Sequence, residues 1–363
     1  MKIILVVGAR PNYMKIAPIY FALKSEQNFH PLIVHTGQHY DNNLSEIFFE
    51  ELGLPEPDTY LGVGSGTHGE QTSRIMIEFE KVLLNEQPGL VMVAGDVNST
   101  IACALDSVKL HIPVAHLEAG LRSYDRRMPE EINRVLTDSI SEILLTPSLD
   151  ANENLKKEGV SDERIFFVGN AMIDSLRRYE KLAERSNILE QLNITSNNYG
   201  LITLHRPSNV DNKKSFEKII TAFEEIEKKI PLIFPIHPRS RKQIKQFSLK
   251  SQFENMKNLK FIEPVGYLDF LKLEKDAKLV LTDSGGIQEE TTVFGVPCIT
   301  IRENTERPIT IKQGTNQLVG NDTQKIIKAV KSILGGYCKE RTIPKFWDGK
   351  TALRVMEVLK HFV

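Results

Sequence analysis

Short apolar runs alternate with amphipathic stretches along almost the whole chain. Each run is followed by a polar or glycine turn and then by apolar residues at helical spacing, a pattern typical of β-strands that alternate with α-helices. Near-continuous apolar strands of this kind are buried on both faces of a parallel sheet. The runs end at Gly8, Thr36, Gly95, Leu117, Thr146 and Val168 in the first half, and at Leu204, Ile236, Ile262, Thr282, Ile301 and Val319 in the second. The pattern therefore predicts two Rossmann-like, doubly wound parallel-sheet domains of the α/β class, with a cleft between them.

The two sets of runs also suggest domain boundaries. We expect an N-terminal domain over residues 1–170, a C-terminal domain over residues 171–350, and a last helix over residues 351–363 that crosses back to the N-terminal domain. The length agrees with this division, because 363 residues exceed what one hydrophobic core usually holds.

Composition narrows the class further. The net charge is −1 and the basic residues are scattered, which argues against a nucleic-acid binder. The cysteines, Cys103, Cys298 and Cys338, lie in separate segments and form no metal or disulfide pattern. The first residues form a strand without a cleavage site, and no apolar run approaches membrane-spanning length. We therefore expect a cytoplasmic enzyme that has no membrane partner.

Carboxylates stand at two predicted strand ends and at one predicted helix start. Asp96 follows the strand at 91–94, Glu118 follows the strand at 113–115, and Glu130 comes directly after Pro129. The carboxyl ends of parallel strands face the crevice where such sheets bind ligands, so these residues are candidates for acid/base chemistry. Plainer interpretations remain: Asp96 could cap the next helix, and Glu130 could merely favour a helix start. Glu118 has neither a cap role nor a cation close in sequence.

Two turns have the composition of anion sites. Arg10 follows Gly8 after the first strand, and Lys15 comes about one turn into the next helix. In the second half, Ser284, Gly285 and Gly286 follow a strand and could hold a diphosphate with backbone amides, while Glu290 could accept hydrogen bonds from a ribose. A solvated basic pair and a plain connecting turn are the alternatives.

Histidines give one further candidate. His205 ends a predicted strand and could act as an acid, a base or a phosphate donor. The other histidines fall across strand ends and loops instead of on one helical face, so we expect no metal site. The glycine-rich run at 62–67 follows no clear strand, and we expect it to be a mobile loop.

Several motifs together resemble those of one enzyme family, the non-hydrolysing UDP-N-acetylglucosamine 2-epimerases. The resemblance extends from Met1 to about Gly320 and implies a GT-B fold, a homodimer, and neither a cofactor nor a required metal. The implied reaction converts UDP-N-acetylglucosamine reversibly into UDP-N-acetylmannosamine, through loss and re-addition of UDP at an enzyme-held 2-acetamidoglucal. The motifs are GARP at 8–11 with Lys15, TGQH at 36–39, GD at 95–96, HLEAGLR at 116–122, PEEINR at 129–134, HR at 205–206, DSGGIQEE at 283–290 and TERP at 305–308.

The resemblance also implies roles for single residues. Glu290 would bind the ribose, and Phe270 would lie against the uracil. The residues that move protons would be Asp96, Glu118, Glu130 and His205, and those that hold the phosphates and the sugar would be Arg10, Lys15, Ser284, Gly285, Gly286 and Arg307.

One segment departs from the family pattern. Many bacterial members carry Glu/Gln-Met-Leu-Asp shortly after the GQH motif, and this segment is linked to activation by a second substrate molecule. Here the segment is YDNNL at 40–44, so we expect no such activation and see room for a modified sugar, such as a diacetamido uronic acid. A hydrolysing epimerase, a GT-B glycosyltransferase and a nucleotide-sugar sensor are the rival functions.

Overall fold

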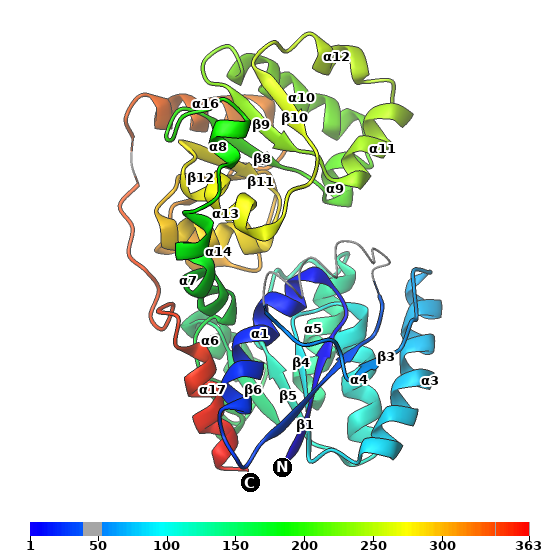
Figure 1. Cartoon of the computed structure of the whole chain (residues 1–363). Coiled ribbons are helices and arrows are strands. Elements are labelled where there is room, and N and C mark those ends of the chain that lie inside the picture. Colours follow the sequence, from blue (N-terminus) through cyan, green and yellow to red (C-terminus); the bar gives the residue numbers. More distant parts are fainter. Residues whose placement is uncertain (39–52, 338, 363) are drawn as a thin grey trace. The chain divides into compact units, whose positions relative to one another are not determined.

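The computed structural model describes residues 1–38, 53–337 and 339–362 of the chain. These residues form two compact units, one of Met1–Arg178 with Lys345–Val363 and the other of Tyr179–Pro344. Each unit is built around one parallel sheet covered by helices (Figure 1). Among the described residues, no helix is both long enough and apolar enough to cross a lipid bilayer.

The sheet of the first unit is parallel throughout and has the strand order β3-β2-β1-β4-β5-β6-β7. Its strands are β1 (Lys2–Val7), β2 (His30–His35), β3 (Thr59–Tyr60), β4 (Leu90–Ala94), β5 (Val114–Leu117), β6 (Ile143–Thr146) and β7 (Ile165–Phe167). Its helical segments are α1 (Arg10–Lys24), α3 (His68–Glu86), α4 (Asn98–Lys109), α5 (Pro129–Ile140), α6 (Leu149–Lys157), η1 (Asp162–Arg164) and α17 (Thr351–Lys360), and α7 (Ala171–Ala183) continues past its boundary.

The central strand β1 shows why this sheet is covered on both sides. Ile4 and Val6 pack in one core cluster with Phe79 of α3 and Ala102 of α4. Helix α1 contacts β1 and β2, and α17 packs along α1, as Figure 1 also shows. The last helix of the chain therefore belongs to the first unit.

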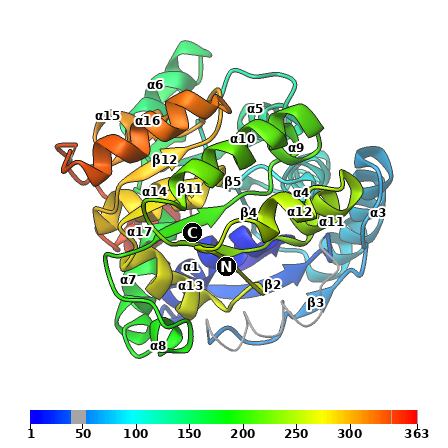
Figure 2. The same cartoon turned by 90° about the horizontal axis from the view of Figure 1, so that it is seen from above.

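The sheet of the second unit has the order β10-β9-β8-β11-β12-β13 and is also parallel throughout. Its strands are β8 (Gly200–Thr203), β9 (Leu232–Pro235), β10 (Leu259–Ile262), β11 (Leu279–Thr282), β12 (Cys298–Thr300) and β13 (Asn316–Leu318). Its helices are α8 (Ile188–Gln191), α9 (Pro207–Val210), α10 (Lys213–Ile226), α11 (Pro238–Gln246), α12 (Lys250–Glu254), α13 (Tyr267–Lys275), α14 (Gly285–Phe294), α15 (Pro308–Lys312) and α16 (Thr323–Leu334). Helices α10 and α16 pack side by side and share the larger core of this unit (Figure 2).

The fold class predicted from the hydrophobic pattern is confirmed. Both sheets have the Rossmann strand order, in which the first and fourth strands lie side by side. From these two strands, the later strands are added in opposite directions across the sheet. In the first unit this switch point lies between β1 and β4, and in the second between β8 and β11. Ligands of doubly wound sheets bind beyond the carboxyl ends of the strands at this point.

Two details differ from the sequence-based expectation. The glycine run at 62–67 does follow a strand, the two-residue β3, and the Val63 and Gly64 amides donate to the Thr36 and Gly37 carbonyls at 3.1 and 2.9 Å. The compact units meet at residues 178–179, inside α7, whereas the predicted boundary lies at residue 170. A boundary inside a continuous amphipathic helix leaves no loop composition to mark it.

Candidate functional site

The switch point of the first sheet brings together a lysine and a carboxylate from distant parts of the sequence. Lys15 of α1 forms an ion pair with Glu118, which directly follows β5. Both side chains are buried. A buried charge is costly to desolvate, and a partner of opposite sign offsets that cost. Glu118 therefore has the cation that its sequence neighbours do not offer.

The backbone around this ion pair is specialised. Glu118 has a φ of +77°, which non-glycine residues adopt rarely and at a cost of about 1–3 kcal/mol. The Leu145 carbonyl accepts the amides of Glu118 and Ala119, at 3.0 and 3.1 Å, and so holds this turn. Gly95 has a φ of +70°, and a Cβ there would lie 2.8 Å from Lys15 Nζ. Only glycine leaves room for the ion pair at this strand end.

A second carboxylate, Asp96, lies at the end of the neighbouring strand β4. Its side chain pairs with Arg134 of α5, and its backbone carbonyl accepts a hydrogen bond from Asn133 Nδ2 at 2.9 Å. The N-cap residue of α4 is Val97, so the alternative in which Asp96 caps this helix is wrong. Arg134 also contacts Glu131 at 2.6 Å, which fixes the guanidinium that orients Asp96.

The adjacent glutamates at the start of α5 have different surroundings. Glu131 is buried and accepts the Ser123 and Tyr124 amides at 3.0 and 2.8 Å, so it holds the preceding loop. Glu130 is half-buried in the first helical turn and makes no hydrogen bond or ion pair with any residue the structure describes. Glu130 is therefore the glutamate of this pair that can exchange protons with a ligand.

A buried charged network supports these strand ends. His116 of β5 contacts Asp138 through Nδ1 at 2.6 Å and donates through Nε2 to the Gly95 carbonyl at 2.8 Å. Asp138 also accepts from Arg122 at 2.7 Å. Burial alone would raise the pKa of Asp138, but the charges and hydrogen bonds of His116 and Arg122 outweigh it and lower the pKa. The network fixes the Gly95 turn, and with it the environment of Lys15 and Glu118.

The switch point of the second sheet presents a histidine. His205 directly follows Leu204 after β8, and its Nδ1 contacts the buried Asp283 at 3.0 Å. Asp283 also accepts the amides of His205 and Arg206 and the side chain of Asn209, at 2.8–3.1 Å. Burial would raise the pKa of Asp283, but these partners outweigh it and lower the pKa. An ionised Asp283 keeps the proton on Nδ1, which leaves Nε2 for proton transfer or phosphate binding.

The start of α14 has the properties of a phosphate site. The helix begins at Gly285 and Ser284 makes no side-chain cap, so no side chain caps the first-turn amides. A Cβ on Gly285 would lie 2.5 Å from Arg307 Nη1. Arg307 contacts Glu289 at 2.8 Å and Glu306 at 2.5 Å, and Glu306 also contacts Arg302 and Arg206, at 2.7 and 3.6 Å. Three guanidinium groups against two carboxylates leave this cluster positive, as an anion site requires.

Glu290 of α14 is held by a neighbouring helix. Its Oε1 accepts the Tyr267 hydroxyl of α13 at 3.0 Å. Burial and the adjacent Glu290 charge raise the pKa of Glu274, also on α13, well above its usual range. The raised pKa favours the protonated form of Glu274 beside Glu290. Phe270 lies on the same helix, half-buried against the smaller core cluster of this unit.

Comparison with known proteins decides the family. The family model described as UDP-N-acetylglucosamine 2-epimerase matches residues 21–360. The chain belongs to this family. It is therefore an isomerase of the epimerase type.

The relatives of this epimerase span its whole length. It is 49% identical to the UDP-N-acetylglucosamine 2-epimerase of Methanocaldococcus jannaschii, with 99% of each chain covered. It is 44% identical to the UDP-2,3-diacetamido-2,3-dideoxy-D-glucuronate 2-epimerase of Pseudomonas aeruginosa, again with 99% of each covered. A crystal structure of the M. jannaschii UDP-GlcNAc 2-epimerase, in complex with UDP-GlcNAc and UDP, matches it with a TM-score of 0.93 and 49% identity, over 99% of this chain and 100% of that one.

Two of the predicted site residues of this epimerase meet in the structure. The structure places Lys15 and Glu118 together and gives Asp96 its own cation. The side chain of Arg10, at the start of α1, and the YDNNL segment at 40–44 lie outside the described residues. Sequence reasoning assigned no role to several residues that position the candidates: Arg134, Glu131, His116, Asp138, Asp283, Glu289, Glu306 and Tyr267. The Glu131–Arg134 pair also has the i,i+3 spacing that places two side chains on one face of a helix.

Proposed function

We propose that this epimerase inverts C2 of UDP-N-acetylglucosamine, giving UDP-N-acetylmannosamine, without net hydrolysis. Family membership supports an epimerase acting on a UDP-sugar. The residues of the first switch point supply acid/base groups, and those of the second supply an anion site and a ribose ligand. No oxidation or reduction of the substrate is needed, so the proposed reaction uses no redox cofactor.

The proposed chemistry is elimination followed by re-addition. The C2 proton is acquired by a base while the C1–oxygen bond to UDP breaks, which leaves a C1=C2 double bond in 2-acetamidoglucal. UDP then adds back to C1, and C2 receives a proton on the opposite face. Departure of UDP avoids a free carbanion at a carbon that is a poor acid, and cationic and amide donors on the diphosphate stabilise the leaving group. Two proton-transferring groups are needed, because the proton leaves and returns on different faces.

Two cation-paired carboxylates at adjacent strand ends, the buried Glu118 and the half-buried Asp96, carry this proposal. Glu118 with Lys15 and Asp96 with Arg134 come from β5 and β4, which are neighbours in the sheet. Each carboxylate is paired with a different cation, Lys15 for Glu118 and Arg134 for Asp96. The two carboxylates can therefore exchange protons independently of each other. We assign proton transfer to Asp96, Glu118, Glu130 and His205; phosphate and sugar binding to Arg10, Lys15, Ser284, Gly285, Gly286 and Arg307; ribose binding to Glu290; and uracil contact to Phe270.

One relative favours a second substrate. The P. aeruginosa protein that is 44% identical over 99% of this chain acts, by its name, on UDP-2,3-diacetamido-2,3-dideoxy-D-glucuronate. That sugar carries a carboxylate and a second acetamido group, and its inversion at C2 would use the same elimination. We propose it as the alternative substrate, and we further propose that the enzyme acts as a homodimer, which light scattering on the purified protein can test.

Product analysis distinguishes these functions. The purified enzyme is incubated separately with the two UDP-sugars, and the sugar protons are followed by NMR. We expect a mixture of UDP-N-acetylglucosamine and UDP-N-acetylmannosamine from either direction, with no free UDP accumulating. Conversion of only the diacetamido uronate would favour the alternative. Stoichiometric release of UDP with free N-acetylmannosamine would instead identify a hydrolysing epimerase and overturn the proposal. The Asp96→Asn protein serves as the matched control with strongly reduced activity.

A further inference from the structure

Asn170 carries a buried hydrogen-bond donor that no described residue of the first unit accepts. It lies between β7 and α7, and its side chain is 2% exposed. Its Oδ1 accepts the Met172 amide at 2.9 Å, whereas its Nδ2 has no hydrogen-bond partner among the described residues. Most buried polar side-chain atoms are paired, and leaving one unpaired costs about 1–3 kcal/mol. An unpaired amide nitrogen in this position therefore calls for a ligand.

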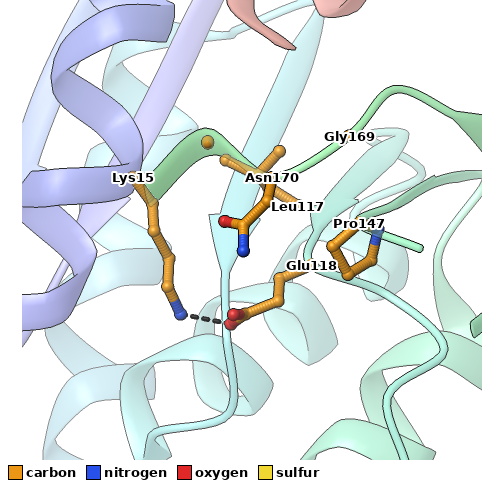
Figure 3. A pocket seen from close by; sticks show the side chains of 7 residues that line it. Lys15, Leu117, Glu118, Pro147, Gly169 and Asn170 are labelled. Carbon is orange, nitrogen blue, oxygen red and sulfur yellow. Dashed lines mark hydrogen bonds and ion pairs between the residues drawn. The ribbon is translucent and has the colours of Figure 1, made fainter. Parts of the chain in front are cut away.

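The unpaired nitrogen belongs to a residue that lines a small cavity. The cavity has a volume of about 10 Å³, and Lys15, Glu118, Pro147 and Gly169 line it together with Asn170. Figure 3 shows the amide nitrogen of Asn170 pointing toward the Lys15–Glu118 pair. A space of this size accommodates about one oxygen atom or one water. The backbone is fixed here, because Gly169 has a φ of +95° and a Cβ on it would lie 2.2 Å from the Phe346 carbonyl oxygen.

The charges around the cavity define the kind of ligand. Lys15 and Glu118 neutralise each other, and the Asn170 amide is uncharged, so of the two ligand parts proposed for Lys15 the uncharged sugar, and not a phosphate, fits this cavity. An NH₂ group can only donate, so its partner must be an acceptor. The ligand that fits is an uncharged oxygen, such as a sugar hydroxyl or an acetamido carbonyl.

We propose that Asn170 is a substrate-binding residue, whose Nδ2 donates a hydrogen bond to an oxygen of the sugar and holds it against the Lys15–Glu118 pair. This inference rests on the proposed function, because that function brings a sugar to Glu118. In the unliganded protein one water can take the same place. Helix capping explains the Oδ1 contact with α7, but it does not explain Nδ2, since serine or aspartate would cap the helix as well.

Two substitutions separate the donor from the cap. Asn170→Ser and Asn170→Asp both keep an oxygen for the Met172 amide, and both remove the NH₂ group. The same two changes at Asn212, whose side chain caps α10 by accepting the Ser215 amide at 3.1 Å in the second unit, serve as controls. Calorimetric titration measures the dissociation constants of UDP and of UDP-N-acetylglucosamine, and thermal denaturation measures stability.

We expect the Asn170 variants to bind UDP as the wild type does and to bind UDP-N-acetylglucosamine about tenfold more weakly, the loss of one hydrogen bond. Turnover should fall at least as much, with melting temperatures close to the wild type. The Asn212 variants should change neither affinity nor turnover.

Two results would overturn the inference while leaving the proposed function intact. One is that the Asn170 variants bind UDP-N-acetylglucosamine as tightly as a wild type that epimerises it. The other is a loss of turnover with unchanged affinity, which would assign Nδ2 to a structural water. A wild type that binds UDP-N-acetylglucosamine without converting it would overturn the proposed function alone, since the affinities still test Asn170. A wild type that does not bind this sugar nucleotide would overturn both.

Discussion

Separating the buried Lys15–Glu118 pair should have a large effect on stability. The two side chains are only 8% and 7% exposed, so Glu118→Gln leaves the Lys15 ammonium buried without its carboxylate, and Lys15→Met takes from the buried Glu118 its ion-pair partner Lys15. Glu118→Gln and Lys15→Met remove one charge each and keep similar side-chain volume. Glutamine also keeps the same Cβ at the strained φ of +77°, so the backbone cost at residue 118 does not change. The change in stability therefore reports the charge.

The expected magnitude follows from the burial. Removing one partner of a buried ion pair costs roughly 3–5 kcal/mol. In a unit of about 150–250 residues, 1 kcal/mol shifts the melting temperature by about 2–4 °C, so each single variant should melt about 6–20 °C lower. The double variant has no unpaired charge and should recover much of this loss. Turnover should stay lost by about 10²–10⁴-fold in Glu118→Gln and in the double variant, because stability returns without the acid/base group.

Scanning calorimetry of the wild type, both single variants and the double variant forms a complete double-mutant cycle. The Asn212→Ser protein controls for handling, and UDP titration of Glu118→Gln confirms that this variant retains its nucleotide site. Strictly additive losses in the double variant would refute the reasoning, because independent sites show no coupling. Single variants that melt within 1–2 °C of the wild type would refute it as well (a limit of about 0.5 kcal/mol by the same conversion).

Three further changes test other parts of the site. Asp96→Asn should reduce turnover by about 10²–10⁴-fold, with an unchanged UDP dissociation constant by calorimetry; near-normal turnover would remove Asp96 from the proton chemistry. Arg10→Lys should weaken UDP binding by about 10–100-fold, because lysine cannot form the bidentate phosphate contact, and an unchanged constant would make Arg10 a surface residue. Burial and the nearby Glu80 raise the pKa of Asp106 to about 7. Native Asp106 thus holds its proton more tightly than the unfolded chain, so its contribution to stability falls as the pH rises from about 4 through about 7. Asp106→Asn should therefore raise the melting temperature relative to the wild type at about pH 8 and not at about pH 4; an equal difference at both pH values would contradict this.

The hydrophobic pattern predicted the sheets well for a physical reason. Strands such as β4 are buried on both faces, so their sequence is apolar throughout and ends abruptly at the polar turn. The strand β3 was missed because two residues, Thr59 and Tyr60, are too short to show any periodicity. The division between the compact units lies inside α7, where no turn in the sequence marks it.

The candidate site was only partly predictable. Strand ends identified Asp96, Glu118 and His205, since parallel strands place their carboxyl ends at one edge of a sheet. Their partners come from elsewhere: Lys15 lies 103 positions from Glu118, and such pairs depend on the three-dimensional fold. Asn170 shows the limit most clearly, because sequence alone assigned it to a domain boundary, whereas its role depends on an unpaired atom inside a cavity.

Deuterium incorporation at C2 tests the central claim most directly. The enzyme is incubated with UDP-N-acetylglucosamine in heavy water, and the C2 position of both epimers is read by proton NMR and mass spectrometry. Elimination with proton exchange at a protein acid predicts one deuterium at C2 of UDP-N-acetylmannosamine and of the recovered UDP-N-acetylglucosamine. With Asp96→Asn, incorporation should be about 10²–10⁴-fold slower. Epimerised product that retains its original C2 hydrogen would contradict the elimination mechanism and the roles assigned to Asp96 and Glu118.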